Sequence, residues 1–193
     1  MTDFLRKLFS NLLNKFAKWF VFLGFKPNTI TLIGVLGNFI AAFFLAAGRF
    51  FMGGILVLVF GLFDAIDGPM ARLQGDENQF GAFLDSVSDR ISELAIYFGI
   101  LLNSINKLDF INCTLVFLAT GSSLLVSYVR ARAESVGIMV KIGLITRVER
   151  YLILVPTLLF KRPEIGLSII AFFGYFTVIQ RIWYVRKKFI VKE

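Results

Sequence analysis

The sequence contains no histidine and a single cysteine, Cys113, among its 193 residues. These absences exclude metal sites and catalytic centres built on imidazole or paired thiolates, and they exclude an intrachain disulfide. Acidic residues are also scarce, with 13 Asp and Glu against 21 Lys and Arg, and the formal net charge is +8. Any metal centre or acid–base chemistry must therefore rely on carboxylates and other oxygen ligands.

Apolar residues dominate the chain, which is 57% hydrophobic with 23 Phe and a mean hydropathy of +0.76. Several apolar runs reach the ~20 residues that a helix needs to cross a bilayer. This composition predicts an all-α integral membrane protein with the lipid bilayer as its surroundings. A basic balance can indicate nucleic-acid binding, but in such an apolar chain it favours loops at an anionic membrane surface, so no nucleic-acid partner is expected.

Two regions are expected along the chain. In residues 1–25, apolar side chains recur at helical spacing and basic or amide side chains fill the other face, which predicts an amphipathic juxtamembrane helix in the membrane interface. Residues 26–193 are expected to form one domain of six transmembrane helices, the first capped by Asn28 or Thr29. The predicted spans are about 29–48, 51–73, 79–102 and 110–133, then a fifth that ends at about 160, and a sixth at about 164–184.

The positive charges indicate how these spans are oriented. Most of the 21 Lys and Arg residues fall in the two termini and in the segments between spans two and three and between spans four and five. The positive-inside rule therefore predicts a multi-pass plasma-membrane protein with both termini on the cytoplasmic side.

Residues 64–89 contain an unusual density of acids for so apolar a chain: Asp64, Asp67, Asp85 and Asp89. The first two share one helix face and the last two share another, and a break at 75–78 allows the two helices to run antiparallel. Each carboxylate costs about 2.5–3.5 kcal/mol at a membrane helix centre, so a counter-charge is required. An all-oxygen cluster suits Mg²⁺ or Mn²⁺. Arg90 and Glu93, three residues apart, are expected to form an ion pair beside this cluster.

The order of these residues resembles a known signature. Asp64-x-x-Asp67-Gly68-x-x-Ala71-Arg72, eight residues, and Gly81-x-x-x-Asp85-x-x-x-Asp89 match at every position the signature of the CDP-alcohol phosphatidyltransferases. The resemblance implies an enzyme that transfers a phosphatidyl group from a CDP-lipid to an alcohol and releases CMP. It also implies a homodimer and two metal ions, Mg²⁺ or Mn²⁺, held by Asp64, Asp67, Asp85 and Asp89. Asp89 would in addition act as general base on the acceptor hydroxyl.

The resemblance also assigns a binding site for the CDP-lipid, either CDP-diacylglycerol or CDP-archaeol. Its residues would be Asn28, Thr31, Asp64, Gly68, Ala71, Arg72 and Gly81. Small residues at 68 and 71 would leave room for the nucleotide and diphosphate beside the backbone. The alternative is that Gly68 and Ala71 serve helix packing, and that Asn28 and Thr31 serve capping and packing.

A basic cluster bears on the acceptor. The pattern Ser127-Tyr128-x-Arg130-Ala131-Arg132, then Arg147-x-x-Arg150, then Gln180-Arg181 is similar to the phosphatidylinositol-phosphate and archaetidylinositol-phosphate synthases. That similarity implies that the phosphate of inositol 1-phosphate is bound by Ser127, Arg130, Arg150 and Arg181. The subgroup often has Lys at position 130. Two alternatives remain: glycerol 3-phosphate needs the same phosphate contacts, and the arginines could simply obey positive-inside placement.

Other function classes fit the sequence less well. Intramembrane carboxylates also mark ion or metal transporters, but those predict acids at mid-membrane depth and internal repeats. Here the acids fall near one end of their spans and no repeat is evident. A non-catalytic membrane scaffold would not require four acids at metal-binding spacing.

Overall fold

The computed structural model describes residues 3–75 and 78–190, with side chains described from residue 13 onward. Within those ranges the chain is all-helical and has no strand. The helices are α1 (Asp3–Phe22), α2 (Pro27–Ala46), α3 (Phe50–Gln74), α4 (Gln79–Asn106), α5 (Phe110–Ser135), α6 (Arg147–Leu159) and α7 (Pro163–Ile190). The all-α class is thereby confirmed. Of the amphipathic helix predicted over residues 1–25, the side chains of residues 1–12 lie outside the described part of the chain.

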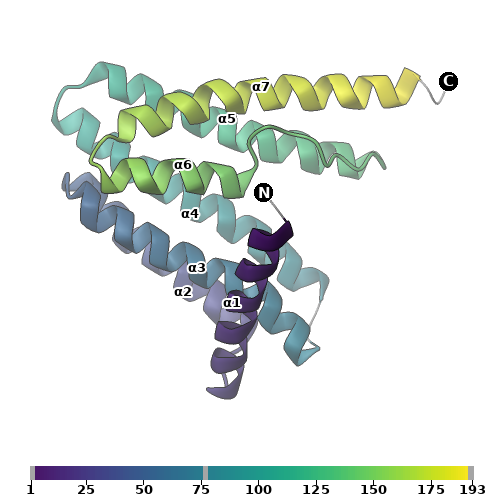
Figure 1. Cartoon of the computed structure of the whole chain (residues 1–193). Helices are drawn as coiled ribbons and strands as arrows, with labels where there is room; N and C mark the ends of the chain where they lie inside the picture. The colour runs from purple at the N-terminus through teal and green to yellow at the C-terminus, as the bar shows by residue number, and fades with distance from the viewer. Residues whose placement is uncertain (1–2, 76–77, 191–193) are drawn as a thin grey trace.

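The helices form an up-and-down bundle with one helix across it (Figure 1). The short turns after α2, α4 and α6 lie at one end of the bundle, and the α3–α4 turn, the α5–α6 loop and the C-terminal end of α7 lie at the other. Helix α2 packs against α3 and α4, α5 against α7, and α6 against α3 and α7. Helix α1 crosses α3, where Ala17 joins the buried Ile30, Ile66 and Met70.

Four of the helices are long and apolar enough to cross a membrane: α2, α3, α5 and α7. Their outward faces carry exposed aromatic side chains such as Phe43, Phe117 and Phe172, as expected for helices in contact with lipid. Helix α4 has 28 residues but carries several charges. Helix α6 has 13 residues, which span about 20 Å against a hydrocarbon core of about 30 Å. The chain is therefore a membrane protein with four candidate spans, and the six-span arrangement stays a prediction.

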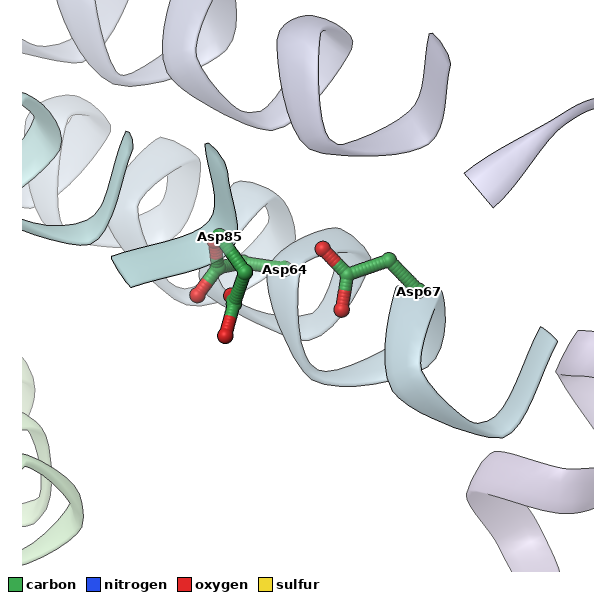
Figure 2. A group of neighbouring side chains, drawn as sticks. All are labelled: Asp64, Asp67 and Asp85. Carbon is green, nitrogen blue, oxygen red and sulfur yellow. The ribbon is translucent and has the colours of Figure 1, made fainter. Parts of the chain in front are cut away.

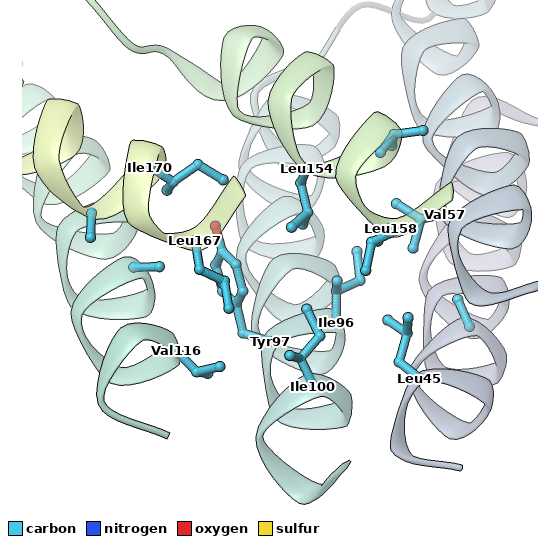
Figure 3. Close-up of a cluster of buried hydrophobic side chains, with 14 residues drawn as sticks. Leu45, Val57, Ile96, Tyr97, Ile100, Val116, Leu154, Leu158, Leu167 and Ile170 are labelled. Atoms are coloured by element: carbon cyan, nitrogen blue, oxygen red, sulfur yellow. The ribbon is translucent and has the colours of Figure 1, made fainter. Parts of the chain in front are cut away.

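The main apolar core surrounds α4 (Figure 3). Ile96, Tyr97 and Ile100 of this helix are fully buried, and they contact apolar side chains of α2, α3, α5, α6 and α7. This cluster lies two to three helical turns beyond Asp89 along α4. This packing therefore fixes the position of α4 relative to α3 and α6, and with it the position of the acidic residues at the start of α4.

The first helix of the bundle begins earlier than predicted. Lys26 is its N-cap residue, Pro27 is its first residue, and no side chain caps it. The prediction that Asn28 or Thr29 caps this helix is therefore wrong. Proline is well suited to the first helical position because the backbone N–H that it lacks has no partner there in any case. Helix α4, by contrast, is capped by Asn78, whose side chain accepts from Gly81 N–H at 2.6 Å.

A glycine on α4 sets its distance from α2. A Cβ at Gly99 would lie 2.8 Å from the Ala42 Cα and even closer to the Ala42 carbonyl oxygen, so the two backbones touch. We expect Gly99→Ala to destabilise the protein by about 1–3 kcal/mol, because the helices must separate. Thermal unfolding in detergent measures this.

The matched control is Gly68→Ala on α3. A Cβ there would meet only the Arg72 side chain, at 3.7 Å. Its unfolding temperature should not fall, since alanine favours a helix over glycine. Equal unfolding temperatures for the two variants would contradict the close contact of α2 with α4.

Candidate active site

Three aspartates meet between α3 and α4. One carboxylate oxygen from each of Asp64, Asp67 and Asp85 lies within 4.8 Å of the other two. Figure 2 shows the Asp67 carboxylate directed toward those of Asp64 and Asp85. Asp64 and Asp67 are buried, and Asp85 is half-buried. Three converging carboxylates without intervening cations are electrostatically unfavourable, so this cluster is suited to hold a divalent cation.

Asp89 lies one turn further along α4, outside that group, where two arginines contact it. Its Oδ1 is 2.5 Å from Arg147 Nη1, and its Oδ2 is 3.2 Å from Arg90 Nη1. The contact with Arg147 lacks hydrogen-bond geometry, and Oδ1 has no hydrogen-bond partner among the described residues. A proton or a cation that binds this oxygen must therefore compete with the Arg147 guanidinium.

Arg147 contacts the acidic cluster, although the sequence pattern placed it only in the basic cluster. It is the first residue of α6 and pairs with Asp64 as well as Asp89. Its guanidinium also lies 5.6 Å from the centre of the Tyr151 ring. The only sequence signal was its position three residues before Arg150, which positive-inside placement explains equally well.

The ion pair predicted between Arg90 and Glu93 is wrong. Arg90 contacts Asp89 and the Ser86 carbonyl, while Glu93 pairs with Arg150 of α6. The physical reason is burial. Glu93 faces the interior of the bundle, where a guanidinium from another helix offers it two hydrogen bonds, whereas Arg90 is partly exposed.

A cavity of about 450 Å³ adjoins the three aspartates. It collects every residue predicted to bind the CDP-lipid except Asp64, which lies in the acidic cluster instead. The predicted residues that line it are Asn28, Thr31, Gly68, Ala71, Arg72 and Gly81. Asp67 and Asp85 also line it, so a ligand in this cavity would touch the acidic cluster.

Small residues shape the cavity wall. Gly68 and Ala71 both line the cavity. A Cβ at Gly68 would meet no atom of another helix within 4 Å, which disfavours the packing alternative for Gly68. At Gly81, a Cβ would lie 3.3 Å from Asn78 Oδ1 and 3.7 Å from Asn28 Oδ1. Gly68 and Gly81 thus leave their backbone atoms accessible to a ligand in the cavity.

Thr31 and Gly68 orient the Asp67 carboxylate. Thr31 Oγ1 donates to Asp67 Oδ2 at 2.6 Å, and the Gly68 backbone N–H lies 2.6 Å from Asp67 Oδ1. Thr31 is on α2 and is buried. A carboxylate that is held by two donors keeps its remaining lone pairs in fixed directions, which is what an ordered cation site requires.

The predicted acceptor residues come from three helices. Ser127 donates to the Ser123 carbonyl, and Arg130 forms an exposed pair with Glu134. Arg150 and Arg181 are buried. Arg181 of α7 donates to the Val126 carbonyl of α5. Arg150 of α6 is linked to Ser123 of α5 through Glu93 and Tyr97, so the predicted acceptor residues lie where these helices approach one another.

Arg181 is held by backbone groups. It donates from Nε to the Ile142 carbonyl at 2.9 Å and from Nη1 to the Val126 carbonyl at 2.6 Å. The α5–α6 loop packs directly on it, because Gly143 has a φ of +150° and a Cβ there would lie 3.1 Å from Arg181 Nη2. The guanidinium is thereby fixed by backbone carbonyls, and it forms no salt bridge with a carboxylate of the described residues.

Comparison with known proteins agrees with this geometry. The sequence profile of the CDP-alcohol phosphatidyltransferase family matches residues 25–183. The archaetidylinositol phosphate synthase of Pyrococcus horikoshii is 36% identical over 177 residues, covering 91% of this chain and 92% of the relative.

Solved structures give the same result. The phosphatidylinositol phosphate synthase of Mycobacterium tuberculosis with CDP-DAG bound superposes with a TM-score of 0.83 at 28% identity, covering 91% of this chain and 94% of that one. The same protein in complex with manganese and citrate gives a TM-score of 0.77 at 29% identity, covering 90% and 88%. The signature between Asp64 and Asp89, the helical bundle that presents it and these matches together place the chain in the CDP-alcohol phosphatidyltransferase family.

Proposed function

We propose that this protein is a membrane phospholipid synthase that transfers a phosphatidyl or archaetidyl group from a CDP-lipid to inositol 1-phosphate and releases CMP. The observation that carries the proposal is the pairing of a cavity at the aspartate cluster with the arginines of α5, α6 and α7 that are predicted to bind phosphate. The names of the relatives support the same acceptor.

The residues at the acidic cluster fit a divalent metal. Three buried or half-buried carboxylates converge, and they supply the hard oxygen ligands that Mg²⁺ and Mn²⁺ prefer. We assign Asp64, Asp67 and Asp85 as the main ligands, with Asp89 completing a site for two ions. When bound, the ions would offset the negative charge that develops on the departing CMP.

The protein's own residues would position the reaction. The cavity lined by Asn28, Thr31, Gly68, Ala71, Arg72 and Gly81 holds the CDP-lipid with its diphosphate beside Asp67 and Asp85. The acceptor hydroxyl oxygen bonds to the lipid-side phosphorus, and the bond from that phosphorus to the CMP oxygen breaks. Asp89 takes the hydroxyl proton, since no histidine is present and a carboxylate is then the natural base. In-line positioning of this kind supplies most of the catalysis in phosphoryl transfer.

The acceptor phosphate is assigned to Ser127, Arg130, Arg150 and Arg181. Serine or choline would not require several guanidinium groups, whereas a phosphate uses them as forked donors. Glycerol 3-phosphate carries the same phosphate and is the second candidate.

An acceptor panel tests the proposal. Purified protein in detergent receives CDP-diacylglycerol or CDP-archaeol with Mg²⁺ or Mn²⁺, and CMP release is followed with inositol 1-phosphate, glycerol 3-phosphate, free inositol and serine. We expect CMP release only when inositol 1-phosphate is the acceptor. Release with glycerol 3-phosphate instead would establish the second candidate, and release with free inositol or serine would contradict the phosphate site.

The membrane arrangement is part of the proposal. Helices α4 and α6 would complete six spans, so that residues 26–193 form one transmembrane domain and α1, within residues 1–25, lies in the membrane interface. The acidic cluster and both termini would face the cytoplasm, and two chains would form a homodimer in the plasma membrane. This orientation is supported by the place of three segments at the same end of the bundle: the α3–α4 turn, the basic α5–α6 loop and the C-terminal end of α7 (Figure 1).

A further inference from the structure

We infer that Glu93 is a positioning residue for the acceptor phosphate: it fixes the guanidinium of Arg150 so that one nitrogen, Nη1, remains available to the phosphate. The inference rests on the proposed function, because it concerns the acceptor site of that reaction. Glu93 lies on α4, one turn beyond Asp89, and was not among the residues expected to take part in the reaction.

Glu93 and Arg150 form a buried, two-point ion pair. Arg150 Nε lies 2.6 Å from Glu93 Oε1, and Arg150 Nη2 lies 2.9 Å from Glu93 Oε2. The two residues are 7% and 2% exposed. A planar guanidinium that is held along one edge by a carboxylate cannot rotate, so its opposite edge has a fixed direction.

The remaining nitrogen of Arg150 is the feature that points to a ligand. Nη1 is buried and has no hydrogen-bond partner among the described residues. A buried, unused N–H donor is unfavourable unless something pairs with it. Arg181 is held at the Val126 carbonyl, on the segment of α5 that also carries Ser127, so we expect an anion at this point to be attracted by both arginines.

Glu93 is itself contacted by Tyr97 of its own helix, which links it to α5. The Tyr97 hydroxyl lies 3.5 Å from Glu93 Oε1 and 3.2 Å from Ser123 Oγ. The Ser123 carbonyl accepts the hydroxyl of Ser127, which is another predicted phosphate ligand. Glu93 therefore links α4, α5 and α6 beside the predicted acceptor residues.

The test is the pair of Michaelis constants of Glu93→Gln. Glutamine is nearly isosteric but removes the charge and one acceptor oxygen, so Arg150 is no longer held at both nitrogens. We expect the KM for inositol 1-phosphate to rise about tenfold or more, as when an outer-shell partner of a binding group is lost. The KM for the CDP-lipid should stay unchanged. Tyr97→Phe, which removes only the hydroxyl that supports Glu93, should raise the KM for inositol 1-phosphate by a smaller factor.

The matched control is Ser104→Ala, which removes a buried hydroxyl from the same helix, where it donates to the Ile100 carbonyl. Neither KM should change. If Glu93→Gln and Tyr97→Phe both raise the two constants equally, or leave both unchanged, the positioning role is wrong. Failure of the proposed function is read separately, on the unaltered protein: no CMP release with inositol 1-phosphate would overturn the function and this inference with it.

Discussion

Asp85→Asn is expected to lower CMP release by more than about 100-fold, since even outer-shell partners of a metal typically contribute 10–100-fold. Asp85 supplies one of the three converging carboxylates and also lines the cavity. Asparagine keeps the size of the side chain and removes the charge that a divalent cation requires. The loss should appear in the rate at saturating substrate, measured as CMP release with inositol 1-phosphate, and more metal should not fully restore it.

Asp109→Asn is the matched control for this substitution. Asp109 caps α5 at the opposite end of the bundle and accepts from the Asn112 backbone N–H at 3.0 Å. Asparagine caps a helix about as well as aspartate, so both activity and stability should be retained. An Asp85→Asn protein that keeps more than about a tenth of the original rate would show that this carboxylate is not an essential ligand.

The second large effect concerns stability. Arg150→Leu leaves the Glu93 carboxylate buried without its partner, which should destabilise the folded protein by about 3–5 kcal/mol. The double variant Glu93→Leu/Arg150→Leu removes both charges and should regain most of this stability, because an apolar pair can replace a buried ion pair. It should nevertheless fail to use inositol 1-phosphate. Thermal unfolding in detergent and CMP release measure the two properties.

An exposed ion pair provides the comparison. Arg130 and Glu134 are one turn apart on α5, and their side chains are 57% and 44% exposed. Arg130→Leu should therefore change stability by less than about 1 kcal/mol. If the double variant were as unstable as Arg150→Leu alone, the destabilisation would come from lost packing and not from an unpaired carboxylate.

The acidic cluster was predictable from the sequence because its determinants are local. Asp64 and Asp67 are three residues apart, and the helical period alone places them on one face. Asp85 lies in the first part of the next helix, α4, which places it beside Asp64 and Asp67. The cavity residues were accessible only through the resemblance, since nothing in their spacing connects Asn28 on α2 with Gly81 on α4.

The ion pairs were not predictable, because their partners are distant in sequence. Arg147 contacts Asp64 across 83 positions, and Arg150 contacts Glu93 across 57. The local rule of three-residue spacing favoured Arg90 for Glu93, but burial within the bundle outweighs an exposed local contact. The start of α2 differs from the prediction for another reason. Asn28 and Thr29 have side chains that can cap a helix, but the fixed φ of Pro27 suits the first helical position, so the helix begins there.

The most direct test of the central assignment is Mn²⁺ binding by the purified protein, followed by electron paramagnetic resonance in detergent with CDP-diacylglycerol present. The account predicts two bound Mn²⁺ ions per chain, and loss of that binding in Asp64→Asn/Asp67→Asn/Asp85→Asn while the variant remains folded. Undiminished Mn²⁺ binding by a folded triple variant would contradict the assignment of the metal centre to the carboxylates between α3 and α4.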